Sequence, residues 1–137
     1  VAIIAGMGLA AEIASSNIKK NADHILSLEN HFKKELKNIY PQVIFNGNPK
    51  QKLPGLISVT FPRYKSDIIA AKLDRLGMAI SNGAACGSGI VQPSHVLKSI
   101  GLSDNNNIST IRISFGNTNT HNEVKMLLDA FKSITSG

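Results

Sequence analysis

Thr110-Ile111-Arg112-Ile113-Ser114-Phe115 is the stretch that decides the fold, because apolar and polar side chains alternate along its whole length. This alternation is typical of a β-strand with one buried face and one polar face. Residues 56–61 alternate in the same way and predict a second half-buried strand. Short apolar runs at 43–45 and 78–80 predict further strands, so we expect a small sheet of three or four strands, mostly antiparallel.

Helical periodicity flanks the predicted strands. Apolar side chains recur every three or four residues over 7–40, which predicts one long helix, or two joined near Asn21, ended by Pro41. Shorter helices are predicted at 66–76, at 93–100 and after the capping box Thr120-x-x-Glu123. Residues 103–107 are predicted to be an exposed polar loop. The expected fold is therefore α+β in two layers, a short sheet with helices packed on one face, the N-terminal helix being long.

Length and composition fit one ordinary globular domain. The 137 residues are 42% hydrophobic, and no apolar run is long enough to span a membrane. The apolar start has no basic segment before it, unlike a signal peptide, so we expect a cytoplasmic protein without a membrane partner. The net charge is +6, but the lysines are spread along the chain and aromatic residues make up only 5% of it. This pattern argues against nucleic acid as a partner.

The single cysteine, Cys86, lies in a run of small residues from Ser81 to Gly89. One cysteine excludes an internal disulfide and fits a reducing compartment. Cysteine is often buried among bulky apolar neighbours, which Cys86 lacks, and the glycines around it restrict the backbone little. We therefore predict an exposed, mobile loop. The thiol is either reactive or an inert loop cysteine, since reactivity requires a cationic or dipolar environment.

Arg112 is the second candidate, because this long charged side chain lies in the middle of a predicted strand. It is either a solvated or salt-bridged surface residue, or a guanidinium that receives a carboxylate in bidentate geometry. Sequence spacing leaves both interpretations open. The four histidines show no metal-ligand spacing, so no metal site is expected. His95 is the histidine nearest Cys86 in sequence, but a separation of nine positions gives no reason to expect contact.

The order of motifs around these two residues closely resembles the C-terminal part of cysteine desulfurases of the NifS/IscS type, which are class-V aminotransferases of PLP-dependent fold type I. The motifs are Ser81-x-Gly83-x-Ala85-Cys86-x-Ser88, Pro93-Ser94-His95-Val96-Leu97 and Ile111-Arg112-Ile113-Ser114. Supporting matches are Ile4-Ala5-Gly6-Met7-Gly8, Leu53-Pro54-Gly55 and Asn117-x-x-Thr120-x-x-Glu123. The resemblance covers essentially the whole chain, and the spacing after Cys86 resembles the class with the extended catalytic loop.

The resemblance implies a reaction and two site residues. Enzymes of this family use pyridoxal phosphate to convert L-cysteine to L-alanine, and they keep the sulfur as a persulfide on a loop cysteine. By motif position Cys86 is that nucleophile and persulfide carrier, and Arg112 binds the substrate carboxylate. The catalytic loop would also include Ser81, Gly83, Ala85, Gly87, Ser88 and Gly89. The implied partners are L-cysteine, a sulfur-acceptor protein such as an iron–sulfur scaffold, and a second copy in a homodimer.

Two family features are missing from this sequence. The cofactor lysine motif of the Ser-x-His-Lys type is absent, and so is the large domain that carries it. We therefore expect residues 1–137 to be a single domain, the small C-terminal domain of a larger chain, with no cofactor-binding residue and no activity alone. Two other functions stay open: a non-catalytic docking or dimerisation module for a sulfur acceptor, and a free-standing cysteine-dependent sulfurtransferase.

Overall fold

A four-stranded antiparallel sheet in the order β1-β2-β4-β3 is the centre of the computed structural model, which describes residues 1–82 and 93–136. Its strands are β1 (Ile44–Asn46), β2 (Leu56–Thr60), β3 (Ser81–Asn82) and β4 (Thr110–Ser114). The two strands predicted from alternation, β2 and β4, pair over five residues, with Ser58 opposite Arg112. The predicted antiparallel sheet is confirmed.

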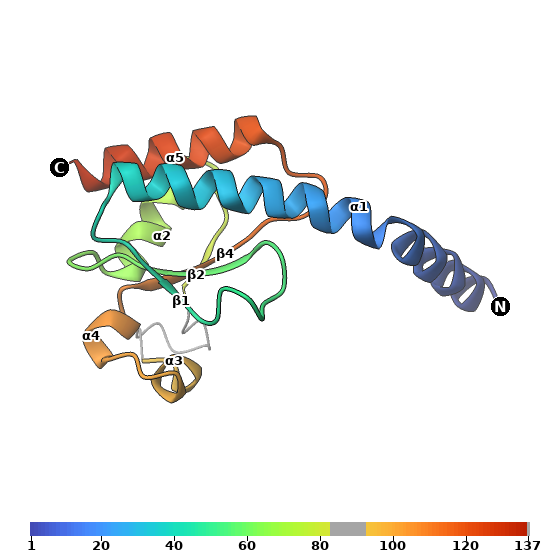
Figure 1. Ribbon diagram of the computed structural model, residues 1–137, viewed down its shortest axis with the longest axis horizontal. Coiled ribbons are helices and arrows are strands. Elements are labelled where there is room, and N and C mark those ends of the chain that lie inside the picture. Colours follow the sequence, from blue (N-terminus) through green and yellow to red (C-terminus); the bar gives the residue numbers. More distant parts are fainter. Residues whose placement is uncertain (83–92, 137) are drawn as a thin grey trace.

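The helices lie on both sides of this sheet. They are α1 (Ala2–Ile39), α2 (Ser66–Asp74), α3 (His95–Ser99), α4 (Asp104–Asn107) and α5 (His121–Thr135). Figure 1 shows α1 and α5 side by side above the sheet, whereas α3 and α4 lie below it. α2 joins the upper layer, since its buried Ile69 and Leu73 belong to the same core as the two long helices. The predicted helix-covered face is confirmed for α1, α2 and α5, but it does not include the two short helices.

The core forms where the apolar sides of β2 and β4 meet the helices. Ile57, Val59, Ile111 and Ile113 are at most 3% exposed and face this core. The long helices contribute Leu28, Phe32, Leu36, Val124, Leu127, Leu128 and Phe131. The predicted buried face of the last helix is confirmed, and so is its capping box, in which the side chains of Thr120 and Glu123 each accept a bond from the other residue's backbone N–H.

The first half of α1 takes no part in this core. It extends beyond the sheet as the blue end of the helix in Figure 1, and the buried residues of α1 begin only at Leu28. Its large apolar side chains, at least 55% exposed, are Val1, Ile3, Ile4, Met7, Leu9, Ile13 and Ile18. The helix is continuous through Asn21, so the alternative of two joined helices is wrong. No helix within the described residues is both long and apolar enough to cross a membrane.

Two local predictions are wrong. Residues 78–80 do not form a strand. α2 ends at Asp74, and in the turn that follows, Gly77 has a positive φ of 74° and Met78 donates its N–H back to Leu73 O at 3.0 Å. The chain therefore stays near α2 and pairs with β4 only from Ser81 onward. The predicted loop at 103–107 contains the one-turn helix α4. The Ser103 side chain caps the start of this helix by accepting the backbone N–H of Asn106.

Gly55 is the point at which α1 is joined to the sheet. Its φ is +78°, and a Cβ there would collide with the Ile25 side chain of α1 and lie 2.7 Å from Phe115 O. The buried carboxylate of Glu29, also on α1, accepts the Gly55 N–H at 3.0 Å and forms ion pairs with Lys33 and Lys52. Burial acts to raise the pKa of Glu29, but the hydrogen bonds from both lysines and from Gly55 outweigh it and hold the pKa below its ordinary value.

Replacing Gly55 with alanine should test this close approach. Gly55→Ala suffers both from the positive φ and from the collision with α1. Gly47→Ala suffers from φ alone, because Gly47 has φ +90° and a Cβ added there would have no neighbouring atom within 4 Å. We expect Gly55→Ala to lower the free energy of unfolding by about 2 kcal/mol more than Gly47→Ala does. Urea denaturation followed by circular dichroism measures both, and equal losses would contradict the close approach.

Glu29→Gln should make the stability of the chain less dependent on pH. The pKa of Glu29 is lower in the folded than in the unfolded chain, so its contribution is full above the unfolded value and is lost as pH falls through the folded value. At pH 7 we expect a loss of about 1–3 kcal/mol, which should shrink below about pH 4. Glu12→Gln, on the exposed part of the same helix, is the control. A loss that stays constant from pH 7 to pH 3 would contradict this assignment.

Candidate functional site

The face of the sheet turned away from α1 and α5 carries a mostly polar surface. We call it the polar sheet face, and by strand register its polar members are Asn46, Ser58, Thr60, Ser81, Thr110, Arg112 and Ser114. Two exposed apolar side chains, Ile44 and Leu56, lie on the same face. Residues directly opposite each other on antiparallel strands point to the same side. One row across three strands therefore reads Ser58, Arg112, Ser81, with the arginine between two hydroxyl side chains.

A directed chain of hydrogen bonds orders one end of the polar sheet face. Asn46 Nδ2 donates to Thr60 Oγ1 at 2.9 Å, the hydroxyls of Thr60 and Thr110 are 2.7 Å apart, and Thr110 Oγ1 lies 2.6 Å from Asn106 O. A threonine hydroxyl has one proton, and that of Thr110 goes to the Asn106 carbonyl. Thr60 is therefore the donor to Thr110, and both buried hydroxyls are satisfied. This chain ties α4 to β2 and β4.

Arg112 is exposed at the middle of the polar sheet face. None of the ion pairs formed by the described residues involves it, and residues 83–92 contain no acidic side chain. The salt-bridged interpretation therefore has no support from side chains of this chain. The backbone of Arg112 is hydrogen-bonded to strands on both sides, and its guanidinium is exposed. Such a group is suited to receive a carboxylate from a small molecule.

The segment that contains the cysteine begins next to Arg112 and ends at a residue that is hydrogen-bonded to α4. On its upstream side, Ser81 and Asn82 pair with Arg112 and Ile111. On its downstream side, the backbone of Ser94 is hydrogen-bonded to the side chain of Asn107, three residues before β4. The predicted loop residues Gly83, Ala85, Cys86, Gly87, Ser88 and Gly89 lie outside the described residues. Of the predicted site residues, the structure thus places Arg112 and Ser81, and it brings them side by side.

Among the described residues, none of the histidines is hydrogen-bonded to Arg112 or Ser81. His24 is partly buried, and its Nε2 lies 2.9 Å from Asn119 O. The ring of His31 contacts that of His121 edge-on, with centroids 5.5 Å apart, between α1 and α5. His95 is exposed on α3. Within residues 1–82 and 93–136, no group of three His, Cys, Asp or Glu side chains could hold a metal ion.

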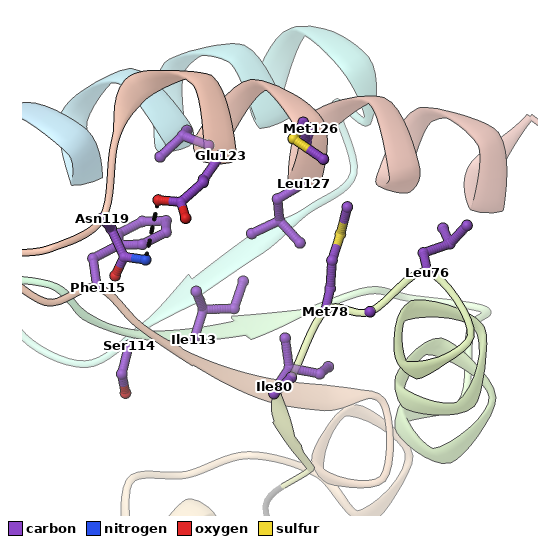
Figure 2. Close-up of a pocket in the computed structure, with 13 residues that line it drawn as sticks. Leu76, Met78, Ile80, Ile113, Ser114, Phe115, Asn119, Glu123, Met126 and Leu127 are labelled. Carbon is purple, nitrogen blue, oxygen red and sulfur yellow. Dashed lines mark hydrogen bonds between the residues drawn. The ribbon is translucent and has the colours of Figure 1, made fainter.

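A separate pocket of about 310 Å³ lies on the helical side of the sheet (Figure 2). Met78, Ile80, Ile113 and Leu127 give it an apolar lining, and the Ser114 side chain points away from it. The carboxylate of Glu123 at its rim already accepts hydrogen bonds from Thr120 and Asn119, and these bonds lower its pKa. The pocket therefore shares neither the face nor the charge of the surface around Arg112, and we assign the candidate site to the polar sheet face.

Comparisons with known proteins agree with this architecture. Residues 1–127 match the family model of the class-V aminotransferases. The chain belongs to this family. It is 35% identical over 125 residues to the cysteine desulfurase IscS of Rickettsia typhi, covering 89% of this chain and 29% of that protein. It is 33% identical over 129 residues to the cysteine desulfurase IscS of Vibrio campbellii, covering 94% of this chain and 31% of that protein.

Solved structures give the same result. A NifS-like protein from Rickettsia africae superimposes with a TM-score of 0.84 at 30% identity, covering 98% of this chain and 34% of that one. A second NifS-like protein gives a TM-score of 0.78 at 26% identity, covering 91% and 30%. The resemblance inferred from the motifs is confirmed. The chain spans about a third of the length of the curated relatives it matches.

Proposed function

We propose that this chain is the small domain of a cysteine desulfurase, an enzyme that takes sulfur from L-cysteine and releases L-alanine. The observation that carries the proposal is the exposed Arg112, which lies between two serines, one of which, Ser81, stands at the start of the segment that contains Cys86. The names of the curated relatives support it, since they are cysteine desulfurases. We further propose an acceptor protein for the sulfur, such as an iron–sulfur scaffold, and a homodimer for the intact enzyme.

Arg112 would anchor the substrate. An amino acid presents a carboxylate, and a guanidinium binds a carboxylate through two parallel hydrogen bonds. Because the backbone of Arg112 lies between β2 and β3, the carboxylate would be bound at a fixed place on the sheet. The serines on either side, Ser58 and Ser81, are polar and small and would leave room for it.

Cys86 would accept the sulfur. Its thiolate attacks the sulfur of bound L-cysteine, a sulfur–sulfur bond forms, and the carbon–sulfur bond of the substrate breaks. The electron pair of the broken bond stays with carbon, which takes up a proton and leaves as L-alanine, while Cys86 keeps a persulfide. Cys86 is four residues beyond Asn82, so covalent geometry allows its Cα up to about 14 Å from that of Asn82. Ser81, Gly83, Ala85, Gly87, Ser88 and Gly89 would form the catalytic loop with it.

The cofactor implied by the family does not fit the described residues alone. Pyridoxal phosphate would supply the electron sink that this bond cleavage requires, and enzymes hold it through a lysine. The polar sheet face, as defined above, contains no lysine. We therefore propose that another part of the full-length protein holds the cofactor opposite Arg112, and that the 137-residue chain alone releases no sulfide from L-cysteine.

The exposed half of α1 supports the same domain arrangement. A contiguous apolar surface of this kind is rarely left in water by a monomeric protein and marks a contact. Its side chains, among them Ile4, Met7 and Ile18, face no other element of the described chain. We propose that this half of α1 packs on the cofactor domain and that residues 1–137 are the small domain.

Substitutions of Cys86 and Arg112 in the full-length enzyme test the proposed chemistry. Cys86→Ala should abolish persulfide formation and sulfide release. Arg112→Lys keeps the charge but loses the bidentate geometry, so we expect kcat/KM for L-cysteine to fall about 10- to 100-fold. Ser114→Ala, exposed on the same strand and face, is the control and should change kcat/KM less than twofold. Full activity of Cys86→Ala, or an Arg112→Lys enzyme equal to the control, would refute the respective role.

A substitution on α1 tests the proposed domain contact. Met7→Glu places a charge on the exposed apolar half of α1. We expect it to destabilise the full-length protein by about 1–3 kcal/mol, while the 137-residue chain keeps its stability, because Met7 has no buried contact there. Lys20→Glu, also exposed on α1, is the control. Thermal denaturation of both lengths gives the comparison, and an unchanged full-length Met7→Glu protein would exclude the contact.

A further inference from the structure

Asn107 is a buried polar side chain whose role the family motifs do not explain. It is the last residue of α4 and is 4% exposed. Its Oδ1 accepts the backbone N–H of Ser94 at 2.8 Å, and its Nδ2 donates to the backbone carbonyl oxygen of Ser94, also at 2.8 Å. Both backbone groups of one residue are thus bound by one amide. The pair of bonds also fixes the orientation of the amide, because a flipped side chain would set donor against donor.

The residues around Asn107 are themselves tied to the sheet. Thr110 Oγ1 donates to Asn106 O at 2.6 Å. Ile108 O accepts the N–H of Ser66 at 2.9 Å, and Ser109 O accepts that of Phe61, also at 2.9 Å. The backbone groups on either side of Asn107 are therefore bonded to β4, to α2 and to the residue that follows β2, so Asn107 is a fixed point relative to Arg112.

Apolar packing contributes little to holding the start of α3. Leu97 is the one residue of this five-residue helix that is buried, and it is 9% exposed. Val96 and the following Ile100 are more than half exposed. The ion pair between Lys98 and Asp104, at 3.0 Å, lies on the surface and adds little. Ser94 O also accepts the N–H of Lys98 at 3.0 Å, but this bond lies within α3. Among the described contacts, the two bonds from Asn107 are therefore the ones that join the backbone of Ser94 to another element.

We propose that Asn107 is a positioning residue for the sulfur-transfer step. It fixes Ser94, and thereby the point at which the chain that follows Cys86 rejoins the fold, relative to the substrate anchor Arg112. Register with β4 fixes the other end at Ser81 and Asn82. This inference rests on the proposed function, since it concerns how Cys86 is delivered to a substrate bound by Arg112. It adds a residue that touches neither substrate nor cofactor.

Two substitutions in the full-length holoenzyme remove the two bonds in different ways. Asn107→Ala deletes the amide. Ser94→Pro deletes only the N–H that Oδ1 accepts, and the φ of Ser94, −65°, is already that of a proline. Ser94→Ala is the matched control, because Asn107 binds only the backbone of Ser94 and the Ser94 side chain makes no capping bond. Asn105→Ala, exposed on the same helix α4, is the second control.

The expected result is a split between binding and transfer. In Asn107→Ala, single-turnover formation of the Cys86 persulfide should slow at least tenfold, while KM for L-cysteine stays within twofold. Ser94→Pro should shift the same rate in the same direction, and both controls should match the parent. Amide hydrogen exchange, which does not depend on activity, should speed up at least tenfold at Ser94 in Asn107→Ala. Should Asn107→Ala fold poorly, Ser94→Pro decides, because it keeps the buried amide.

Other outcomes would overturn the positioning role. An unchanged transfer rate in either substitution would do so, and so would parallel losses in transfer and binding after correction for active sites, which indicate a purely structural residue. These failures are distinct from failure of the proposed function. That would show as persulfide-independent turnover in Cys86→Ala, whatever the behaviour of Asn107→Ala.

Discussion

β4 is hydrogen-bonded on both sides at Ile111 and Arg112, and the rest of the structure depends on this double pairing. A strand held by two neighbours cannot rotate or slip, and a slip of one residue would exchange its two faces. Ile111 and Ile113 therefore stay in the core, against the aromatic side chains of α1 and α5. Arg112 stays on the opposite side. The packing that stabilises the fold thus also orients the guanidinium outward, and no ion pair is required to hold it.

The polar sheet face is ordered by hydrogen bonds in place of packing. The donors run in one direction, from Asn46 through Thr60 and Thr110 to the carbonyl of Asn106. A buried hydroxyl without a partner costs about 1–3 kcal/mol, so breaking one hydrogen bond of this chain would destabilise the hydroxyl that loses its partner. This explains two buried threonines on a face whose other residues are half-buried or exposed. They connect the pairing of β2 and β4 to the position of α4.

Local periodicity was enough to predict the two central strands and the main helices. Alternation in β2 and β4, the capping box at Thr120 and Glu123, and the outward face of Arg112 all depend on neighbours within a few residues, and the structure confirms them. Sequence alone did not reveal that Glu29 and Asn107 are buried. Their partners, Gly55 and Ser94, are 26 and 13 residues away, and only the tertiary fold brings them together. The role assigned to Cys86 comes from the family motif and not from periodicity.

The apolar packing above the sheet and the hydrogen bonds below it have different consequences for function. Apolar side chains pack with little directional preference, so the core above the sheet specifies which face is buried but tolerates small shifts. An amide that binds both backbone groups of Ser94 tolerates neither a shift nor a rotation, because each bond requires its own distance and angle. Under the proposed function, the segment that contains Cys86 would bring one sulfur atom to a substrate bound by Arg112, and it would need the second kind of contact at its point of attachment. This is why a buried asparagine, and not a further leucine, suits the end of α4.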